Sequence, residues 1–498
     1  FLLSALLLTT TVLAYGSLTA GHQWGDDFAS YIMQARGITE FNLNPVTEAN
    51  LFAVTQSETP AYPVLYPWGA PALLAPLYAT FGLDMHALKL LNLGCFIALL
   101  ATIFLLFRGY LSTAYLFFLV SFFACNPRLL NEINNIGSDL PFALFSTLSM
   151  LLIHFIIVRK KRLISHNIDA CALGIALALS VSIRPNGWLL VITALGAHVM
   201  ASRKSSTEPT APTAIRSALP YLCGGALLIA WNFIFLVNLS RFSLIPLPTV
   251  ETIFQNFLTY YLLPLQLFFG APFPWAFYVA FLFFGFLGFS SNWRTAPHFA
   301  FYCVAVLGLY VVWPYYPGIR FILPALPLLF YFALKGLSTF SKTLQEKGVR
   351  QTRAVNLAAG LILLASLSMT SISTALENLR GARNVTEGPF STEALEMFNF
   401  ISSSTRDDDI VVFFKPRLMR LLTNRRSFGS SSQSTATRGA YICLFKGSTE
   451  RLGGHQLDRS LFDDLVERGQ LAPVFENSQF IVGRTVLSDQ EKASIDKL

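Results

Sequence analysis

The sequence predicts a polytopic α-helical membrane protein with a small α/β domain at its C-terminal end. Of the 498 residues, 53% are apolar and only 13% are charged, whereas soluble domains average about 25% charged residues. Long apolar runs also recur from residue 1 to about residue 373. Charges then return in the last part of the chain, which predicts a soluble domain there.

The apolar runs match the length that a bilayer requires. A helix needs roughly 20 apolar residues to cross the hydrocarbon core. We therefore expect about eleven transmembrane helices, at about residues 1–20, 87–107, 110–125, 139–158, 169–183, 185–200, 217–239, 276–291, 298–313, 319–338 and 354–373. The first run is interpreted as a retained span rather than a trimmed signal peptide, and either interpretation leaves the next loop on the same side.

The basic residues of the loops predict the orientation. One set of loops carries most of them, including Arg108 and the run Arg159-Lys160-Lys161-Arg162, while the alternate set carries few. Loops rich in Lys and Arg stay in the cytoplasm. With an odd number of spans, the loops at 21–86 and about 240–275 and the tail after about residue 374 are then extracytoplasmic. We expect a bacterial inner or plasma membrane protein.

Two domains are expected along the chain. The first, residues 1–373, is the transmembrane module with its large first outer loop at 21–86. The second, residues 374–498, is a soluble extracytoplasmic α/β domain, because strand-like and helix-like runs alternate there. The expected strands are 410–414, 441–445 and 479–486, the expected helices are 416–423 and 458–468, and the Ser/Thr-rich stretch 427–437 is expected to be a loop.

The charge balance and the cysteines exclude some classes of protein. The net charge is +8, but the basic residues lie in short clusters between apolar runs rather than on one basic face, which argues against nucleic acid as a partner. The six cysteines never form a C-x-x-C pair and lie mostly in apolar stretches. The sequence therefore encodes neither a disulfide framework nor a zinc site.

An acidic pair opens the first outer loop. Asp26 and Asp27 are adjacent carboxylates at the start of a helical stretch that runs to about Arg36. Neighbouring carboxylates repel, so such a pair suits a helix N-terminus, a bound cation or a proton-transfer site. The alternative is a structural cap, in which one carboxylate accepts the first amides of the helix that follows.

Ionisable residues also gather at the predicted outer ends of the spans. They are Glu132, Asp139, Arg184 and Arg320, with Lys89 on the same face. Ionisable groups at a membrane are candidate functional residues, although each arginine taken alone is also explained by snorkelling to the headgroups. Together, cations and carboxylates on one face describe a site that holds a phosphate beside a general base.

Two tyrosines are further candidates for substrate binding. Tyr66 lies in the Pro- and Tyr-rich stretch 59–71, within an outer loop whose length indicates function, and Tyr316 lies just before Arg320. The structural alternative for the aromatic stretch is that it anchors the protein in the headgroup layer.

The order of these motifs resembles the GT-C glycosyltransferases. The motifs are the acidic pair, the Pro/Tyr stretch that leads into Ala87-Leu88-Lys89-Leu90-Leu91-Asn92, Ser138-Asp139-Leu140-Pro141-Phe142, Arg184-Pro185 and Arg320-Phe321-Ile322-Leu323-Pro324. More narrowly, the chain resembles the branch that holds protein O-mannosyltransferases and the aminoarabinose transferases of lipid A. The resemblance covers about residues 1–373, and the tail resembles the small outer domain that some members append.

The resemblance implies an enzyme that moves one sugar, with inversion, from a polyprenyl-phosphate carrier to an extracytoplasmic acceptor. It implies that Asp26 is the base or its orienter, and that Asp27 supports it or binds a divalent cation. Arg184 and Arg320 would hold the carrier phosphate, with Lys89 as a third candidate. Two departures stand out. The pair is Asp-Asp where the family usually has Asp-Glu, and the lysine that some aminoarabinose transferases place before their Pro-Pro segment is absent.

Three other functions compete with the transferase. A transporter should show internal symmetry and polar residues near the midplane, whereas here the polar residues crowd the outer ends. A polysaccharide polymerase or ligase would use the same lipid carriers, with catalytic Arg and His in a later outer loop. A receptor or assembly subunit predicts that changes at Asp26 and Asp27 affect folding or nothing, rather than turnover.

Overall fold

The computed structural model describes residues 1–58, 63–161, 163–203, 211–235, 248–313, 318–349, 351–380, 388–449 and 455–486, which fold into two compact units. The first unit contains Phe1–Leu18, Asn92–Asn134 and Ser138–Leu379, and the second contains Thr19–Leu91, Asn135–Gly137 and Arg380–Leu498. The first outer loop thus belongs to the same unit as the C-terminal segment. The linear division at residue 373 stays a prediction.

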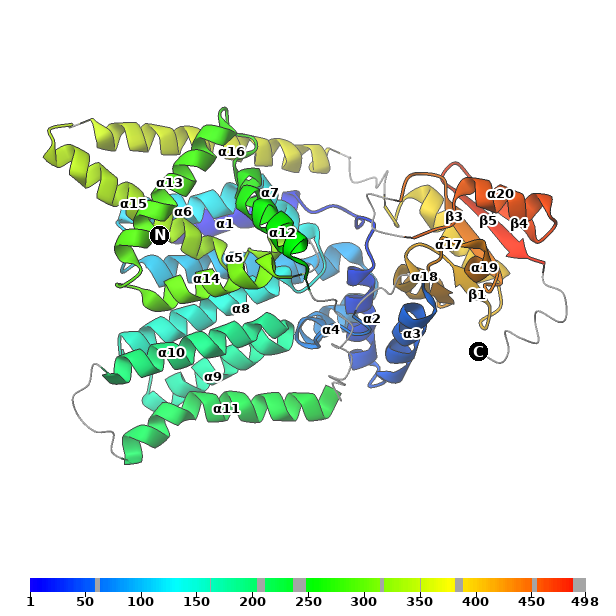
Figure 1. The fold of residues 1–498 in the computed structure, drawn as a ribbon, viewed down its shortest axis with the longest axis horizontal. Helices are drawn as coiled ribbons and strands as arrows, with labels where there is room; N and C mark the ends of the chain where they lie inside the picture. The colour runs from blue at the N-terminus through cyan, green and yellow to red at the C-terminus, as the bar shows by residue number, and fades with distance from the viewer. Residues whose placement is uncertain are drawn as a thin grey trace. The chain divides into compact units, whose positions relative to one another are not determined.

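The first unit is built of helices (Figure 1). They are α1 (Leu2–Gly16), most of α5 (Met85–Phe107), α6 (Thr113–Cys125), α7 (Pro127–Asn131), α8 (Asp139–Leu152), α9 (His166–Ile183), α10 (Trp188–Arg203), α11 (Ala211–Phe235), α12 (Val250–Leu262), α13 (Pro274–Asn292), α14 (Pro297–Val311), α15 (Leu326–Glu346) and α16 (Thr352–Leu379). A π-helical turn, Ile153–Val158, extends α8, and short 3-10 turns lie at Glu132–Asn134, Pro185–Gly187, Leu263–Phe268 and Ile319–Phe321. Each of the eleven predicted runs coincides with one of these helices over most of its described length, except that α15 begins several residues after the predicted start at 319.

Six of the described helices are long and apolar enough to cross a membrane: Met85–Phe107, Asp139–Val158, His166–Ile183, Ser217–Phe235, Pro274–Asn292 and Ala354–Leu379. A bent pair, Thr113–Cys125 with Pro127–Asn134, adds a seventh if its 47° bend lies within one span. Three shorter helices, Leu2–Gly16, Gly69–Phe81 and Pro297–Val311, are also apolar. These helices support a multi-pass membrane protein, whereas the expected number of eleven transmembrane helices stays a prediction.

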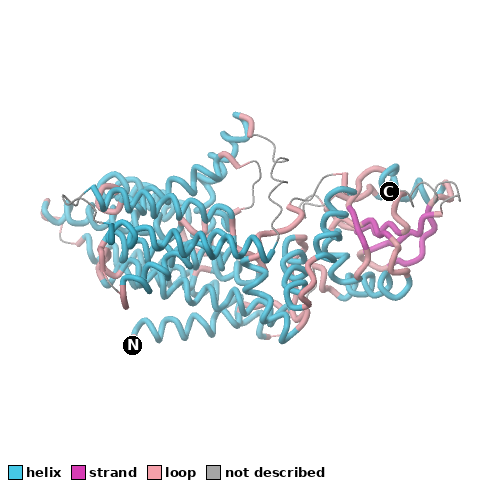
Figure 2. Tube along the Cα trace, turned by 90° about the horizontal axis from the view of Figure 1, so that it is seen from below, coloured by secondary structure: helices cyan, strands magenta, loops and turns pink. Residues whose placement is uncertain are grey.

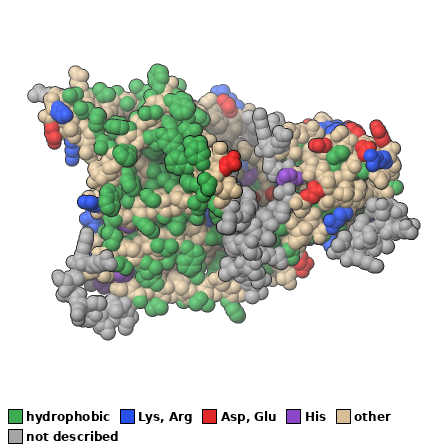
Figure 3. All heavy atoms as spheres, in the orientation of Figure 1, with side chains coloured by type: hydrophobic (Ala, Val, Ile, Leu, Met, Phe, Trp, Pro, Cys, Tyr) green, Lys and Arg blue, Asp and Glu red, His purple; other side chains and the backbone are tan. Residues whose placement is uncertain are grey.

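The outer surface of the first unit is apolar. Figure 3 shows apolar side chains gathered over its helices, and several large ones are mostly exposed, such as Ile229 at 73%, Phe286 at 77% and Met369 at 72%. Soluble monomers rarely expose contiguous apolar patches of this kind. This surface is suited to contact with lipid.

Two helices of the first unit approach so closely that only glycine fits between them. A Cβ atom on Gly288 of α13 would lie 1.8 Å from the carbonyl oxygen of Phe332, and one on Gly336 of α15 would lie 1.9 Å from that of Phe284. Small residues of this kind let helix backbones pack against each other within a membrane.

The second unit combines helices with one sheet (Figure 2). Its helices are α2 (Asp27–Thr39), α3 (Asn44–Gln56), α4 (Gly69–Phe81), the start of α5, α17 (Thr392–Ser404), α18 (Pro416–Thr423), α19 (Gln433–Ala436) and α20 (Arg459–Glu467). The strands are β1 (Ile410–Val412), β2 (Arg426–Phe428), β3 (Tyr441–Phe445), β4 (Leu471–Glu476) and β5 (Phe480–Thr485), in the order β2-β1-β3-β5-β4. β1 pairs in parallel with β2 and β3, while β5 pairs antiparallel with β3 and β4.

The structure confirms the three predicted strands and the two predicted helices of the tail, with small shifts at their ends. It corrects the prediction of a loop at 427–437, because this stretch contains the end of β2 and all of α19. It also adds α17 and β4, which the sequence analysis did not predict.

The first outer loop contributes to the core of the second unit. Phe52 of α3 packs against the cluster that contains Val412, Phe428 and Ile442 of the sheet. The rings of Phe52 and Phe428 lie 6.4 Å apart in an edge-to-face arrangement. Trp24, just before α2, likewise contacts the rings of Phe414 and Phe445. Residues from both ends of the sequence therefore share one apolar core.

Candidate active site

The acidic pair lies in the second unit, at the start of α2. Asp26 is the residue that precedes the helix and Asp27 is its first residue, and both are half-buried. The Asp26 side chain makes no capping hydrogen bond to α2. Instead, its Oδ1 accepts the backbone amide of Arg417 at 3.1 Å and that of Leu418 at 3.3 Å. The structural alternative was that Asp26 or Asp27 caps the helix that follows; the Asp26 carboxylate does not do this, because it is bound by a different helix.

The start of α18 explains why it attracts a carboxylate. Lys415 precedes the helix and Pro416 is its first residue, so the amides of Arg417 and Leu418 are among the first that lack a partner within the helix. The helix dipole also places partial positive charge at this end. The carboxylate of Asp26 satisfies both amides.

Two buried cations belong to the same segment. Arg417 is only 1% exposed and Lys415 is 6% exposed. A terminal nitrogen of Arg417 donates a hydrogen bond to the carbonyl oxygen of Pro63, and its guanidinium carbon lies 5.7 Å from the centre of the Tyr66 ring. Both cations interact electrostatically with Asp26 and Asp27. Buried charges require such partners, since isolated ions are costly to remove from water.

Tyr66 is held by three residues on one face of α2. Its hydroxyl donates a 2.5 Å hydrogen bond to Oδ1 of Asp27. Gln34 donates to its carbonyl oxygen at 2.8 Å and accepts from its amide at 3.0 Å. The Tyr31 ring stacks on the Tyr66 ring at 4.5 Å. Asp27, Tyr31 and Gln34 stand at positions i, i+4 and i+7, which is one helical face.

Burial changes the proton affinity of this group. Desolvation raises the pKa of Asp26 above its usual range, although Arg417, Lys415 and the Leu418 amide oppose the change. Burial, followed by the negative charge of Asp27, raises the pKa of Tyr66 well above its usual value, so its hydroxyl stays a donor. Burial lowers the pKa of Lys415, and Asp26 and Asp27 partly offset this. A carboxylate with a raised pKa is a stronger base.

His22 is close to the pair in sequence but has a structural role. Its Nδ1 hydrogen bonds the carbonyl oxygen of Gln23 at 2.9 Å, and its Nε2 accepts the amide of Ile136 at 3.2 Å. Burial lowers its pKa to about 4, which keeps the ring neutral. Both ring nitrogens are thus engaged with backbone atoms.

Lys89 is fully buried in the same unit. Its Nζ donates to the carbonyl and hydroxyl oxygens of Thr19, each at 2.8 Å, and to the carbonyl oxygen of Gly21. An ammonium group has three protons, and three neutral oxygen atoms accept them here. The predicted role of Lys89 in binding phosphate stays untested.

Arg184 and Asp139 form an ion pair in the first unit. Arg184 follows α9, and its Nε donates to the hydroxyl of Ser138 at 2.7 Å while a terminal nitrogen pairs with Asp139, the first residue of α8. The two side chains are 13% and 6% exposed. The structure thus brings together two predicted site residues that are 45 positions apart in the chain.

Phe321 contacts both predicted arginines. Its ring centre lies 5.3 Å from the guanidinium carbon of Arg184 and 5.8 Å from that of Arg320. Glu132 is separate from this contact and pairs with Arg128 at 3.0 Å, one helical turn away. Tyr316 lies outside the described residues. The predicted role of Arg184 and Arg320 in binding phosphate stays untested.

The sequence analysis missed Arg417, Lys415 and Gln34. The signal for Gln34 was its position on the face of Asp27 and Tyr31. The run of cations in 415–426 is visible in the sequence, but the burial of Lys415 and Arg417 is not. Nothing in the sequence pattern indicates that Arg417 meets Asp26.

The donor groups do not fit a resident divalent cation. Among the described residues, no group of three or more His, Cys, Asp or Glu side chains is arranged to hold a metal. The two carboxylates of the acidic pair already face the cations Lys415 and Arg417. Divalent magnesium and calcium prefer several oxygen ligands, so we derive no step through a metal.

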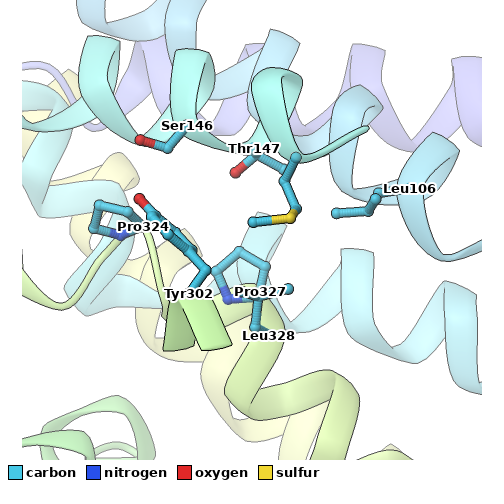
Figure 4. A pocket seen from close by; sticks show the side chains of 8 residues that line it. Leu106, Ser146, Thr147, Tyr302, Pro324, Pro327 and Leu328 are labelled. Atoms are coloured by element: carbon cyan, nitrogen blue, oxygen red, sulfur yellow. The ribbon is translucent and has the colours of Figure 1, made fainter. Parts of the chain in front are cut away.

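A small cavity in the first unit does not serve as a sugar site. Leu106, Ser146, Thr147, Met150, Tyr302, Pro324, Pro327 and Leu328 line it (Figure 4). It has room for roughly one water molecule.

No family model and no curated protein matches the chain. Solved structures do match: ArnT from Cupriavidus metallidurans in the apo state aligns with a TM-score of 0.60 at 13% identity, over 99% of this chain and 98% of that one. The same protein bound to undecaprenyl phosphate aligns with a TM-score of 0.60 at 13% identity, over 97% of this chain and 98% of that one.

The chain has the GT-C fold. Two further structures with this fold match it. The oligosaccharyltransferase AglB from Archaeoglobus fulgidus, in complex with an inhibitory peptide and a dolichol-phosphate, aligns with a TM-score of 0.54 at 10% identity, over 89% of this chain and 69% of that one. The mycobacterial arabinofuranosyltransferase AftD aligns with a TM-score of 0.56 at 12% identity, over 98% of this chain and 42% of that one. The GT-C resemblance predicted from the sequence is confirmed at the level of the fold.

Proposed function

We propose that the protein is an inverting glycosyltransferase that moves a sugar from a polyprenyl-phosphate carrier to an acceptor on the extracytoplasmic side. The observation that carries this proposal is the match of nearly the whole chain to ArnT bound to undecaprenyl phosphate. The AglB complex with a dolichol-phosphate supports the same class of carrier. A helical unit with an apolar surface is suited to a donor with a long lipid tail.

Asp26 is the proposed general base. The acceptor hydroxyl must lose a proton as it attacks the anomeric carbon, and a positioned carboxylate supplies this step. The raised pKa of Asp26 supports this role, as do the two backbone amides that hold its Oδ1 in place. Asp27, held by the Tyr66 hydroxyl, is proposed to support Asp26 and the bound sugar. A single displacement at the anomeric carbon inverts its configuration.

Arg184 and Arg320 are the proposed ligands of the carrier phosphate. The leaving group is a lipid phosphate, and guanidinium groups stabilise the negative charge that develops on it. The ion pair with Asp139 and the hydrogen bond to Ser138 fix the orientation of Arg184. Asp139, Glu132, Tyr66, Tyr316 and Lys89 remain candidates for substrate contacts.

The proposed location is an inner or plasma membrane, with the C-terminal segment outside the cytoplasm. The asymmetry of Lys and Arg among the loops supports this orientation. The second unit, which contains Asp26, Asp27 and the sheet, would then face the periplasm or the cell exterior.

The proposal is tested by donor consumption. Membranes with and without the protein are incubated with a panel of radiolabelled polyprenyl-phosphate sugars, and transfer to endogenous lipid, protein and polysaccharide is measured by extraction. We expect one donor to be consumed only where the protein is present, with free polyprenyl phosphate as the second product. If every donor survives unchanged in membranes that also contain acceptors from a native envelope, the transferase proposal is wrong.

A further inference from the structure

Two cysteines on different helices of the first unit lie in contact. Sγ of Cys171 on α9 is 3.1 Å from Sγ of Cys223 on α11. A disulfide bond is about 2.05 Å long, so the sulfur atoms need to close by only about 1 Å to form one. These residues are 52 positions apart, and both are free thiols in this structure.

The helix backbones beside the cysteines are close enough for such a bond. A Cβ atom on Gly174 would lie 2.3 Å from the carbonyl oxygen of Pro220, and one on Gly224 would lie 2.8 Å from that of Gly174. Gly174 is one turn after Cys171, and Gly224 directly follows Cys223. No side chain of these two glycines separates the helices, and a disulfide requires this kind of close approach between Cα atoms.

The pair faces an apolar environment. Both cysteines are half-buried, and their neighbours Ile168, Ile175 and Leu222 are 52%, 45% and 61% exposed. Both helices belong to the candidate membrane spans. An oxidant that reaches these thiols must therefore be soluble in lipid. In contrast, Cys95, Cys125, Cys303 and Cys443 are buried.

We propose that Cys171 and Cys223 are an oxidisable dithiol that a lipid hydroperoxide converts into a disulfide between α9 and α11. One sulfur attacks the terminal oxygen of the hydroperoxide and breaks its O–O bond, which yields a sulfenic acid and the lipid alcohol. The second sulfur then attacks the sulfenic sulfur, forms the S–S bond and releases water. Two thiols are oxidised and one hydroperoxide is reduced, so the electrons and atoms balance.

The disulfide would fix α11 against α9, the helix that ends just before Arg184. α9 runs from His166 to Ile183, and Arg184 is the next residue. Cross-linking near the start of α9 restricts its sliding and rotation against α11.

The test counts thiols in the full chain. Membranes that contain the protein are treated with cumene hydroperoxide and then denatured in SDS with maleimide-polyethylene glycol, which adds one mass step per free thiol. We expect the oxidised protein to show two fewer mass steps than the untreated protein, and a thiol reductant to restore them. Non-reducing gels should show a monomer, because the bond is intramolecular.

Single substitutions identify the pair. Cys171→Ser and Cys223→Ser should each abolish the loss of two steps, since no partner thiol remains. Cys303→Ser, which removes a buried cysteine, should still lose two mass steps on oxidation. Unchanged labelling after oxidation of the wild type, a disulfide-linked dimer, or a loss of two steps that persists in Cys171→Ser or Cys223→Ser would each overturn the proposal.

Discussion

The carboxylate of Asp26 accepts a hydrogen bond from the backbone amide of Arg417, a residue 391 positions later in the chain, at 3.1 Å. The same residue places its buried guanidinium near Tyr66 and the acidic pair. Arg417 therefore binds the first outer loop in two ways, through its amide and through its side chain. The outer loop and the C-terminal segment are thus joined by charge contacts as well as by their shared apolar core.

Replacement of Arg417 by methionine should destabilise the second unit. The methionine retains much of the volume and the capping amide, but it leaves the half-buried Asp26 and Asp27 without their strongest cation. Removal of one partner from a fully buried ion pair costs about 3–5 kcal/mol, and we expect a smaller loss here because both carboxylates are only half-buried. Pulse proteolysis of the full-length protein in urea measures the loss as a lower midpoint for cleavage of the second unit.

The control for this prediction is Arg459→Met. Arg459 pairs with Asp463 on the surface, where the two side chains are 49% and 48% exposed. Surface substitutions of this kind change stability by about 0.5 kcal/mol or less. An Arg417→Met midpoint equal to that of Arg459→Met would mean that the charge of Arg417 does not hold the unit together.

Replacement of Arg184 by lysine should weaken donor binding. Lysine keeps the positive charge but cannot bond Ser138 and Asp139 with the fixed fork of a guanidinium group. Loss of one hydrogen bond to a charged group costs about 1.5–3 kcal/mol, or roughly a 10- to 150-fold rise in KM for the lipid-linked donor. Arg294→Lys, at an exposed position, is the matched control. A normal donor KM for Arg184→Lys would exclude Arg184 as a phosphate ligand.

The acid side of the pH profile should report Asp26. Burial raises its pKa above 3.8, so the base form is lost as the pH falls through a value higher than that of an ordinary aspartate. We expect kcat/KM to decline on the acid side with a midpoint above 3.8, measured with a buffer series at constant ionic strength. A decline in kcat/KM centred at or below pH 3.8 would contradict this prediction, because burial of the Asp26 carboxyl raises its pKa.

Glu58 should make the second unit sensitive to acid. Burial alone would raise its pKa, but hydrogen bonds from Ser432 and Ser431 outweigh burial and lower the pKa to about 2. A carboxyl with a lowered pKa stabilises the fold above its unfolded value of 4.5, and this stability is lost as the pH falls from 4.5 towards 2.

Proteolysis of the full chain across this pH range tests the role of Glu58. Glu58→Gln should show a flatter loss of protease resistance than the wild type, because glutamine does not titrate. Glu48→Gln changes an exposed glutamate of α3 and should leave the wild-type pH dependence intact. Identical acid profiles for Glu58→Gln and the wild type would mean that the bonds to Ser431 and Ser432 contribute no net stability.

The helical part of the fold was predictable because long apolar runs have few alternatives in a bilayer. The two short strands β2 and β4 were not predictable in this way. β2 lies in a Ser-rich stretch, and β4 contains Pro473, which usually argues against a strand. β4 is the edge strand of the sheet and is irregular between Pro473 and Phe475. Proline is tolerated at such an edge because one side of the strand needs no ladder hydrogen bond.

The candidate site was predictable only where local pattern carries information. Asp26 and Asp27 stand out as neighbours in the sequence, and Arg184 and Asp139 stand out as ionisable residues near the ends of spans. Arg417 gave no such signal, because its partner is on a segment 391 positions away. The contact between Cys171 and Cys223 was hidden for the same reason.

The measurement that tests the central claim most directly compares Asp26→Asn, Asp27→Asn and Asp84→Asn in donor transfer at matched expression. Asparagine keeps an oxygen that accepts the amides of Arg417 and Leu418, so Asp26→Asn removes the base while it preserves the cap. Asp84 is the matched control, since its Oδ1 accepts the amides of His86 and Ala87. We predict that Asp26→Asn lowers kcat by about 100- to 10,000-fold, that Asp27→Asn has a smaller effect, and that Asp84→Asn transfers sugar at the wild-type rate. Full activity of Asp26→Asn in a folded protein would contradict the account, because Asp26 would then serve only to cap α18.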